Sequence, residues 1–255
     1  MALRAAPSKE AITALVKEYP GRFSIGLGID LSSGRSQEIF KWFLASVLFG
    51  ARISQRIVEK TFHAFADRGI VSPETILDTG WDGLVAVLDA GGYVRYDFKT
   101  ATKLLDLCRS LTEGYGADLA NLHDTAADPA DLEQRLTSLA KGIGDVTVNI
   151  FLREMRGIWE KADPLPSNLV IMAARERGIV PKAVKDRAKT LQLLMDAWKE
   201  AGRKKKDFTD FEAALVRAGI ELRRKKRKLI KHPTQRVQQR HVVSSQQKNG
   251  GMTRK

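Results

Sequence analysis

The sequence predicts an all-α protein that ends in a basic tail. Apolar residues recur at three- and four-residue intervals over most of the chain, which is the spacing of amphipathic helices. Ser or Asp precedes many of these segments and Gly follows them, as at helix ends. The net charge of +13 lies entirely after residue 202 of the 255 residues. These three observations predict a helical body with a charged C-terminal extension.

The helices can be placed one by one. The first begins after Ser8 and ends near Tyr19, and a Gly- and Ser-rich stretch follows over 20–35. Within that stretch, residues 23–31 could form an irregular loop or a poor strand. The helix over 38–51 is apolar on most sides, which places it at the centre of the core. The others are expected over 54–69, 73–80, 82–90, 98–115, 132–139, 145–156, 168–177, 184–201 and 208–218, with Ser36, Ser54, Ser72, Asp131 and Ser167 as caps.

The basic charge points to a polyanionic partner. From Arg203 to the end there are 17 basic and 4 acidic residues, whereas the first 202 residues hold 26 of each. We expect residues 221–255 to form a basic tail, disordered from about Lys231, because apolar residues become rare there. Nucleic-acid phosphate contact is the favoured role, with a solubilising tail or a nuclear localisation signal as alternatives. The expected contacts are Arg223, Arg224, Lys225, Lys226, Arg227 and Lys228.

The composition also argues against membrane-spanning, disulfide-linked and metal-binding proteins. No apolar run is long enough to span a membrane, and the N-terminal residues do not resemble a signal peptide. The single cysteine, Cys108, excludes a disulfide framework and an iron–sulfur cluster held by several cysteines. The four histidines show no ligand spacing, so no metal site is expected. The sequence thus indicates a cytoplasmic monomer associated with the nucleoid, or a nuclear one in a eukaryote.

The segment Leu136 to Gly157 carries the most specific pattern. It reads as helix, Lys141-Gly142-Ile143-Gly144, helix. The two glycines allow a tight turn whose backbone N–H groups precede a helix N-terminus, an arrangement that suits a phosphate oxygen. Ile143 would anchor the turn in the core. An ordinary αα-hairpin with a glycine turn is the alternative.

With two further segments, this hairpin resembles the helix–hairpin–helix DNA glycosylases, the superfamily of endonuclease III and the bacterial methyladenine glycosylases. FLASVLFGARISQRIVEKTFHAF (Phe43 to Phe65) and GGYVRYDFKTATKLLDLCRSL (Gly91 to Leu111) are similar to segments of that family in order and spacing. The resemblance covers residues 37–180. It implies two helical lobes with a DNA-facing cleft between them, and a domain over 36–220 between an N-terminal segment, 1–35, and the tail. Lys141, Gly142, Ile143, Gly144 and Thr147 would form the DNA-binding hairpin.

Departures from the family limit the chemistry that the resemblance implies. Val146 stands where bifunctional members carry a lysine nucleophile, so no lyase reaction is expected there. Ser167 falls at the position of the usual catalytic aspartate, which leaves Asp163, four residues earlier, as the candidate. Arg52 takes the place of a glutamine that many members insert into the duplex. A surface arginine and a solvated loop acid are the alternatives for Arg52 and Asp163.

The remaining expectations concern the ligands. Tyr93, Arg95 and Tyr96 could line a base pocket, although both tyrosines could equally be half-buried core residues. The resemblance allows a monovalent cation at the hairpin and no other cofactor. Two functions stay open: a monofunctional glycosylase that hydrolyses the N-glycosidic bond of a flipped, damaged base, and a non-catalytic protein that binds duplex or lesion DNA. An RNA-binding factor is a third alternative.

Overall fold

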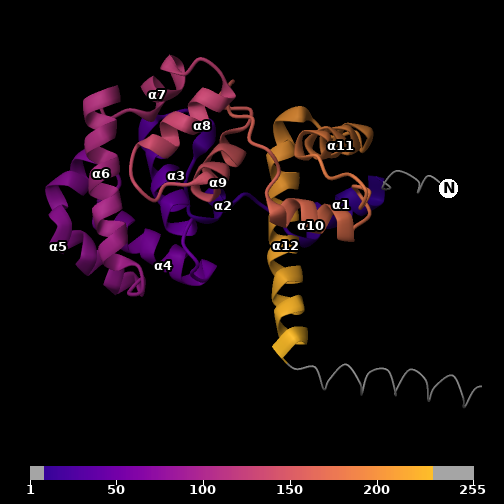
Figure 1. The fold of residues 1–255 in the computed structure, drawn as a ribbon, viewed down its shortest axis with the longest axis horizontal. Helices are drawn as coiled ribbons and strands as arrows, with labels where there is room; N and C mark the ends of the chain where they lie inside the picture. Colours follow the sequence, from indigo (N-terminus) through magenta and orange to yellow (C-terminus); the bar gives the residue numbers. More distant parts are fainter. Residues whose placement is uncertain (1–8, 232–255) are drawn as a thin grey trace, which may run out of the picture.

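The computed structural model describes residues 9–231, and in this range every regular element is helical (Figure 1). The prediction of an all-α chain is therefore confirmed for these residues. Residues 1–8 and 232–255 lie outside the described part, and with them the predicted cap Ser8 and most of the predicted tail.

The helices form two groups that lie side by side (Figure 1). The larger group contains α2 (Phe23–Gly26), α3 (Ser36–Phe49), α4 (Gln55–Ala66), α5 (Pro73–Gly91), α6 (Asp97–Tyr115), α7 (Leu119–Thr125), α8 (Pro129–Ser138) and α9 (Asp145–Met155). The smaller group contains α1 (Lys9–Glu18), α10 (Asn168–Glu176), α11 (Arg187–Glu200) and α12 (Phe208–Lys231). The first helix packs against the last one, so the N-terminal segment is divided between the two groups.

Helix α3 is the centre of the larger group, as its apolar sequence predicts. Trp42 and Phe43 are fully buried, and Trp42 Nε1 donates a hydrogen bond to Phe151 O of α9 at 3.1 Å. The rings of Phe43 and Phe151 meet edge to face at 4.9 Å. This contact fixes α9, and with it the hairpin that precedes α9, against the core.

Local capping explains most of the helix starts. Ser54, Ser72 and Ser167 cap α4, α5 and α10 as predicted, and Ser72 forms a reciprocal capping box with Thr75. The predicted cap Ser36 is wrong, because Ser36 is the first helical residue of α3 and its hydroxyl donates to Asp118. The predicted cap Asp131 is also wrong, because Asp128 caps α8 one turn earlier and Pro129 takes the first helical position. Asp131 instead accepts hydrogen bonds from Ala127 N and Arg135 Nε.

Other differences from the expected elements are small. Gly80 breaks the helical path inside α5 with a φ of 66°, in agreement with the two predicted helices there. Residues 23–31 are neither a continuous irregular loop nor a strand, because Phe23–Gly26 forms one turn of helix. The sequence does not predict helix α7, and α11 begins at Arg187 after an irregular stretch instead of at Val184. Short α7 has only Leu119 and Leu122 buried, which is too few for a periodic signal.

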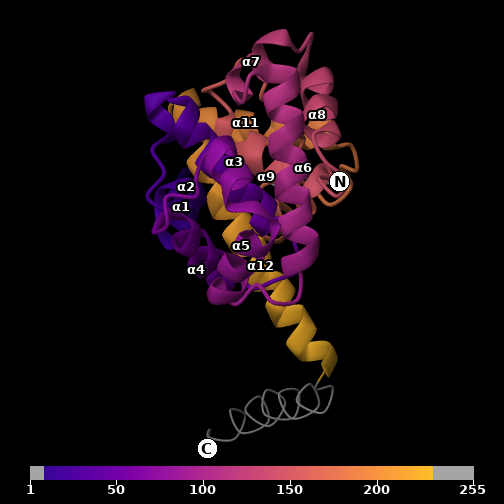
Figure 2. The ribbon, with the colours of Figure 1, turned by 90° about the vertical axis from the view of Figure 1, so that its left-hand side faces the viewer.

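The predicted tail needs correction over residues 221–231. Helix α12 does not end at 218 but continues to Lys231, and at about 1.5 Å per residue its 24 residues span about 36 Å. Its first half is buried through Phe211, Ala214 and Leu215, while its C-terminal turns extend past the rest of the molecule in both views (Figures 1 and 2). The buried half nucleates a helix that the charged half then extends.

Charged side chains join the two groups. Arg22 Nε donates to Asp210 of α12 at 2.9 Å, and Arg156 Nε donates to Glu212 of α12 at 2.9 Å. The guanidinium of Arg217, also on α12, lies 4.0 Å from the ring centroid of Phe23. Helix α12 thus carries these three contacts between the smaller group and the larger one.

Candidate nucleic-acid interface

The hairpin between α8 and α9 forms a tight, anchored turn. Gly142 has a φ of +91°, a conformation that side-chain-bearing residues rarely adopt. Ile143 is buried and its N–H donates to Ala140 O at 3.1 Å, so the predicted anchor is confirmed. Gly144 is the N-cap of α9 and provides no side-chain cap, which leaves the first-turn N–H groups open to an external acceptor. Lys141 and Gly144 are exposed beside them.

Thr147 does not belong to the exposed part of the hairpin. It is buried, and its Oγ1 occupies the space that a Cβ on Gly50, at the end of α3, would need. Its expected DNA contact is therefore corrected to a packing role between α9 and α3. Arg52, three residues after α3 ends, is exposed in the turn before α4.

Lys103 of α6 contacts the hairpin, although no pattern in the sequence indicates this contact. Its Cε lies 3.1 Å from the position that a Cβ would take on Gly142. The two residues are 39 positions apart, so no motif spacing joins them. Only the packing of α6 beside the hairpin brings them together.

Asp163, the predicted catalytic acid, is held by an arginine. It lies in the segment that connects the two groups of helices, 54% of its side chain is exposed, and its carboxylate pairs with Arg156 Nη1. The same guanidinium donates to Pro164 O at 2.6 Å and, through Nε, to the buried Glu212. Arg156 thereby offsets the negative charge that would stabilise a cationic sugar in a hydrolytic reaction.

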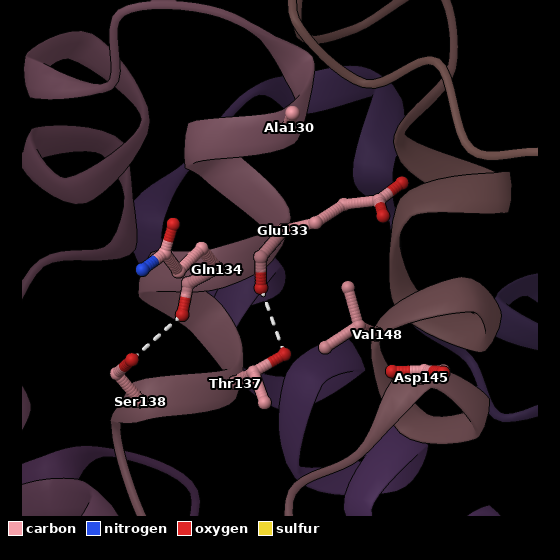
Figure 3. A pocket seen from close by; sticks show the side chains of 7 residues that line it. All are labelled: Ala130, Glu133, Gln134, Thr137, Ser138, Asp145 and Val148. Carbon is pink, nitrogen blue, oxygen red and sulfur yellow. Dashed lines mark hydrogen bonds between the residues drawn. The ribbon is translucent and has the colours of Figure 1, made fainter.

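An open cavity of about 280 Å³ lies between α8 and the start of α9 (Figure 3). Glu133 extends from α8 toward α9, whose Asp145 and Val148 form the opposite wall (Figure 3). Partial burial raises the pKa of Glu133, and the nearby charges of Asp145 and Asp163 raise it further. The cavity is therefore acidic, in contrast to Lys141 on the hairpin and Lys103 beside it. Its remaining wall consists of Ala130, Gln134, Thr137 and Ser138.

The three base-pocket candidates lie in different environments. Tyr93 is fully buried and its hydroxyl donates to Leu48 O at 2.6 Å, so it takes the core role that the sequence left open. Burial raises the pKa of this phenol well above its ordinary value. Tyr96 is half-buried, with the exposed Arg95 guanidinium 5.5 Å from its ring centroid. A base could stack on Tyr96 or Arg95 but could not reach Tyr93 in this arrangement.

The basic end of α12 presents all six predicted contact residues, Arg223 to Lys228, to solvent. Because successive helical residues are separated by about 100°, six in a row place positive charge around the whole helix. Glu221, one turn earlier, pairs with Lys225 Nζ at 2.6 Å and accepts a hydrogen bond from the hydroxyl of Tyr19, the residue after α1. The Glu221 carboxylate raises the pKa of Tyr19 to about 12. These contacts hold the base of the charged segment to the smaller group.

Comparisons with known proteins add no assignment. No family model and no curated protein matches this chain. Within residues 9–231, no three His, Cys, Asp or Glu side chains are grouped so that they could hold a metal ion. No helix in the same range has the length and apolar character needed to cross a bilayer. The resemblance to glycosylases, and the cation that it allows at the hairpin, stay predictions.

Proposed function

We propose that this protein binds the backbone of duplex DNA, in a role like that of base-excision-repair proteins. The observation that carries the proposal is the projecting end of α12, where Arg223 to Lys228 are exposed on a helix whose first half is buried in the core. A preordered row of cations loses little conformational entropy when it neutralises phosphates. The hairpin, with Lys141 exposed beside open N–H groups, supplies a second phosphate contact.

The test measures affinity for a fluorescent duplex at several salt concentrations. We expect tight binding, and the logarithm of the association constant should fall steeply and linearly with the logarithm of the salt concentration. The steepness of that line is the salt slope. Replacing all six residues from Arg223 to Lys228 by Gln preserves helix propensity, and it should weaken binding and lower the salt slope by about 0.9 for each phosphate that the variant no longer neutralises. The charge-matched control replaces six exposed cations elsewhere by Gln, namely Lys17, Lys60, Arg68, Lys182, Lys185 and Lys189.

Two results would contradict the proposal. Equal effects of the two sextuple variants would mean that net charge alone acts, without a defined interface. Tighter binding of a structured RNA hairpin than of duplex DNA at the same salt concentration would support the RNA-binding alternative. Circular dichroism of the α12 variant checks that the helix itself is retained.

A second candidate function is hydrolysis of an N-glycosidic bond, and the acidic cavity favours it. Its volume of about 280 Å³ is close to the lower end, about 300 Å³, of ordinary ligand pockets. Burial and the charges of Asp145 and Asp163 raise the pKa of Glu133, so its carboxyl group holds a proton more readily than an ordinary glutamate and could donate it to a departing base. In this step the C–N glycosidic bond breaks as the base takes the Glu133 proton, water forms the new C–O bond at the sugar, and the proton that the water loses returns to the Glu133 carboxylate.

The catalytic test incubates the full chain with duplexes that carry an alkylated, a deaminated or an oxidised base and measures free base. Release that is lost in Asp163→Asn and in Glu133→Gln would support this function. Glu113→Gln, an exposed change on α6, is the matched control. Absence of release from all three lesions leaves the non-catalytic DNA-binding protein as the proposed function.

A further inference from the structure

The side chain of Lys103 lies across the hairpin rather than extending into water. Its Cε and Nζ lie 3.1 Å and 3.5 Å from the position of a Cβ on Gly142. The φ of +91° favours glycine at position 142, and the end of the Lys103 side chain lies tightly against it. The lysine and the turn pack as one unit although they come from different parts of the chain.

The ammonium group of Lys103 has no counter-ion within residues 9–231. It forms no hydrogen bond or ion pair there, and the side chain is half-buried. Burial alone lowers the pKa of Lys103, without an opposing contribution from an acid. A partly desolvated cation without a partner costs free energy, and an anion bound beside it would remove that cost.

Neighbouring groups make the hairpin side of this lysine cationic. Lys141, directly before Gly142, is exposed. The turn beneath is held in place by buried Ile143. The acid closest to Gly142 along the chain, Asp145, belongs to the wall of the acidic cavity with Glu133 (Figure 3). Asp106, three residues after Lys103 on α6, lies 3.4 Å from Arg109 Nη1. An anion that reaches the turn would meet two ammonium groups on a fixed backbone.

We propose that Lys103 of α6 joins Lys141 in binding one phosphate of a nucleic-acid backbone at this turn. The inference rests on the proposed function and adds to it a residue outside the hairpin. Contact from α6 would fix the phosphate relative to the core as well as to the turn. Such a contact reads no base sequence, because the phosphate is common to all nucleotides.

Lys103→Met tests the inference, since it preserves the length of the aliphatic chain and removes the charge. Duplex affinity should fall and the salt slope should decrease by about 0.9, the contribution of one phosphate contact. The midpoint of thermal unfolding should stay the same or rise, because an unpaired, half-buried cation has been removed. Lys103→Arg should retain most of the binding. Lys189→Met, an exposed change on α11, should leave the slope unchanged.

Inorganic phosphate separates this inference from the proposed function. In the full chain at constant ionic strength, replacing chloride by phosphate should shift the amide NMR signals of Lys141 and Gly142, and Lys103→Met should abolish the shift. That result would support the site even if the wild-type protein bound no DNA. Two results would overturn the inference. One is a Lys103→Met variant with the same DNA affinity and salt slope as the wild type. The other is a phosphate-induced NMR shift of equal size in the wild type and the variant.

Discussion

Glu154 of α9 accepts the backbone N–H of Phe23 at 2.8 Å, although 131 residues separate them. Its second oxygen accepts Ser24 N–H at 2.9 Å, so one carboxylate caps the short helix α2. Glu154 is fully buried and lies 3.9 Å from the equally buried guanidinium of Arg153. One side chain thus connects the start of the larger group to the helix that follows the hairpin.

Glu154→Ala should destabilise the protein by about 3–5 kcal/mol, because it leaves two N–H groups without an acceptor and Arg153 buried without its acid. Glu154→Gln keeps one acceptor and should cost less. Chemical denaturation of both variants measures the difference. The exposed Glu113→Gln should change stability by less than about 0.5 kcal/mol. A similar small loss in Glu154→Ala would contradict the capping role.

Arg156 pairs with two acids, and loss of each pair should lower the free energy of unfolding by a different amount. Arg156→Met leaves Glu212, which is 1% exposed, buried without its hydrogen-bonded cation and should cost about 3–5 kcal/mol. Asp163→Asn breaks only a pair with a 54% exposed acid and should cost at most about 1 kcal/mol. Unfolding in urea measures both changes. The double variant Arg156→Met, Glu212→Leu should recover part of the loss, and the absence of recovery would count against the buried pair.

Close helix contact at Gly91 predicts a steric cost. A Cβ there would stand 2.6 Å from Thr61 Cα and 2.7 Å from Thr61 Cβ, so α4 and α5 would have to separate. Gly91→Ala should destabilise by about 1–3 kcal/mol. Gly114→Ala is the matched control, since its Cβ meets nothing within 4 Å in α6 and should stabilise by about 0.4–1 kcal/mol. Thermal unfolding should give shifts of opposite sign, and equal shifts would refute the packing argument.

Glu133 predicts a pH-dependent stability difference. Its pKa is raised in the folded protein, so folding favours the neutral carboxyl and the stabilising contribution is lost as the pH rises through the folded pKa. Glu133→Gln should therefore be more stable than the wild type at pH 7. The difference in free energy of unfolding between the variant and the wild type should disappear below the ordinary glutamate pKa of 4.5, where both side chains are neutral. Denaturation curves from about pH 3.5 to about pH 7.5 measure this difference, which should not widen toward acid.

Much of the fold could be predicted because its signals are local. The apolar face of α3, the serine caps of α4, α5 and α10, and the glycine turn between α8 and α9 each depend on residues a few positions apart. The predicted helix at 208–218 is too short for a related reason. The exposed half of α12 has no apolar pattern of its own, and it is helical because the buried half before it has already formed the helix nucleus.

The candidate site likewise combines features that neighbouring residues determine with features that only tertiary packing determines. Neighbouring residues suffice for the helical class, the turn at Gly142 and the location of the excess charge, since periodicity, backbone conformation and net charge are local properties. Packing between distant helices is what buries Thr147, pairs Asp163 with Arg156 and lays Lys103 across the turn. Burial of apolar surface over the whole chain determines which helices pack together. A short sequence motif therefore does not predict these contacts.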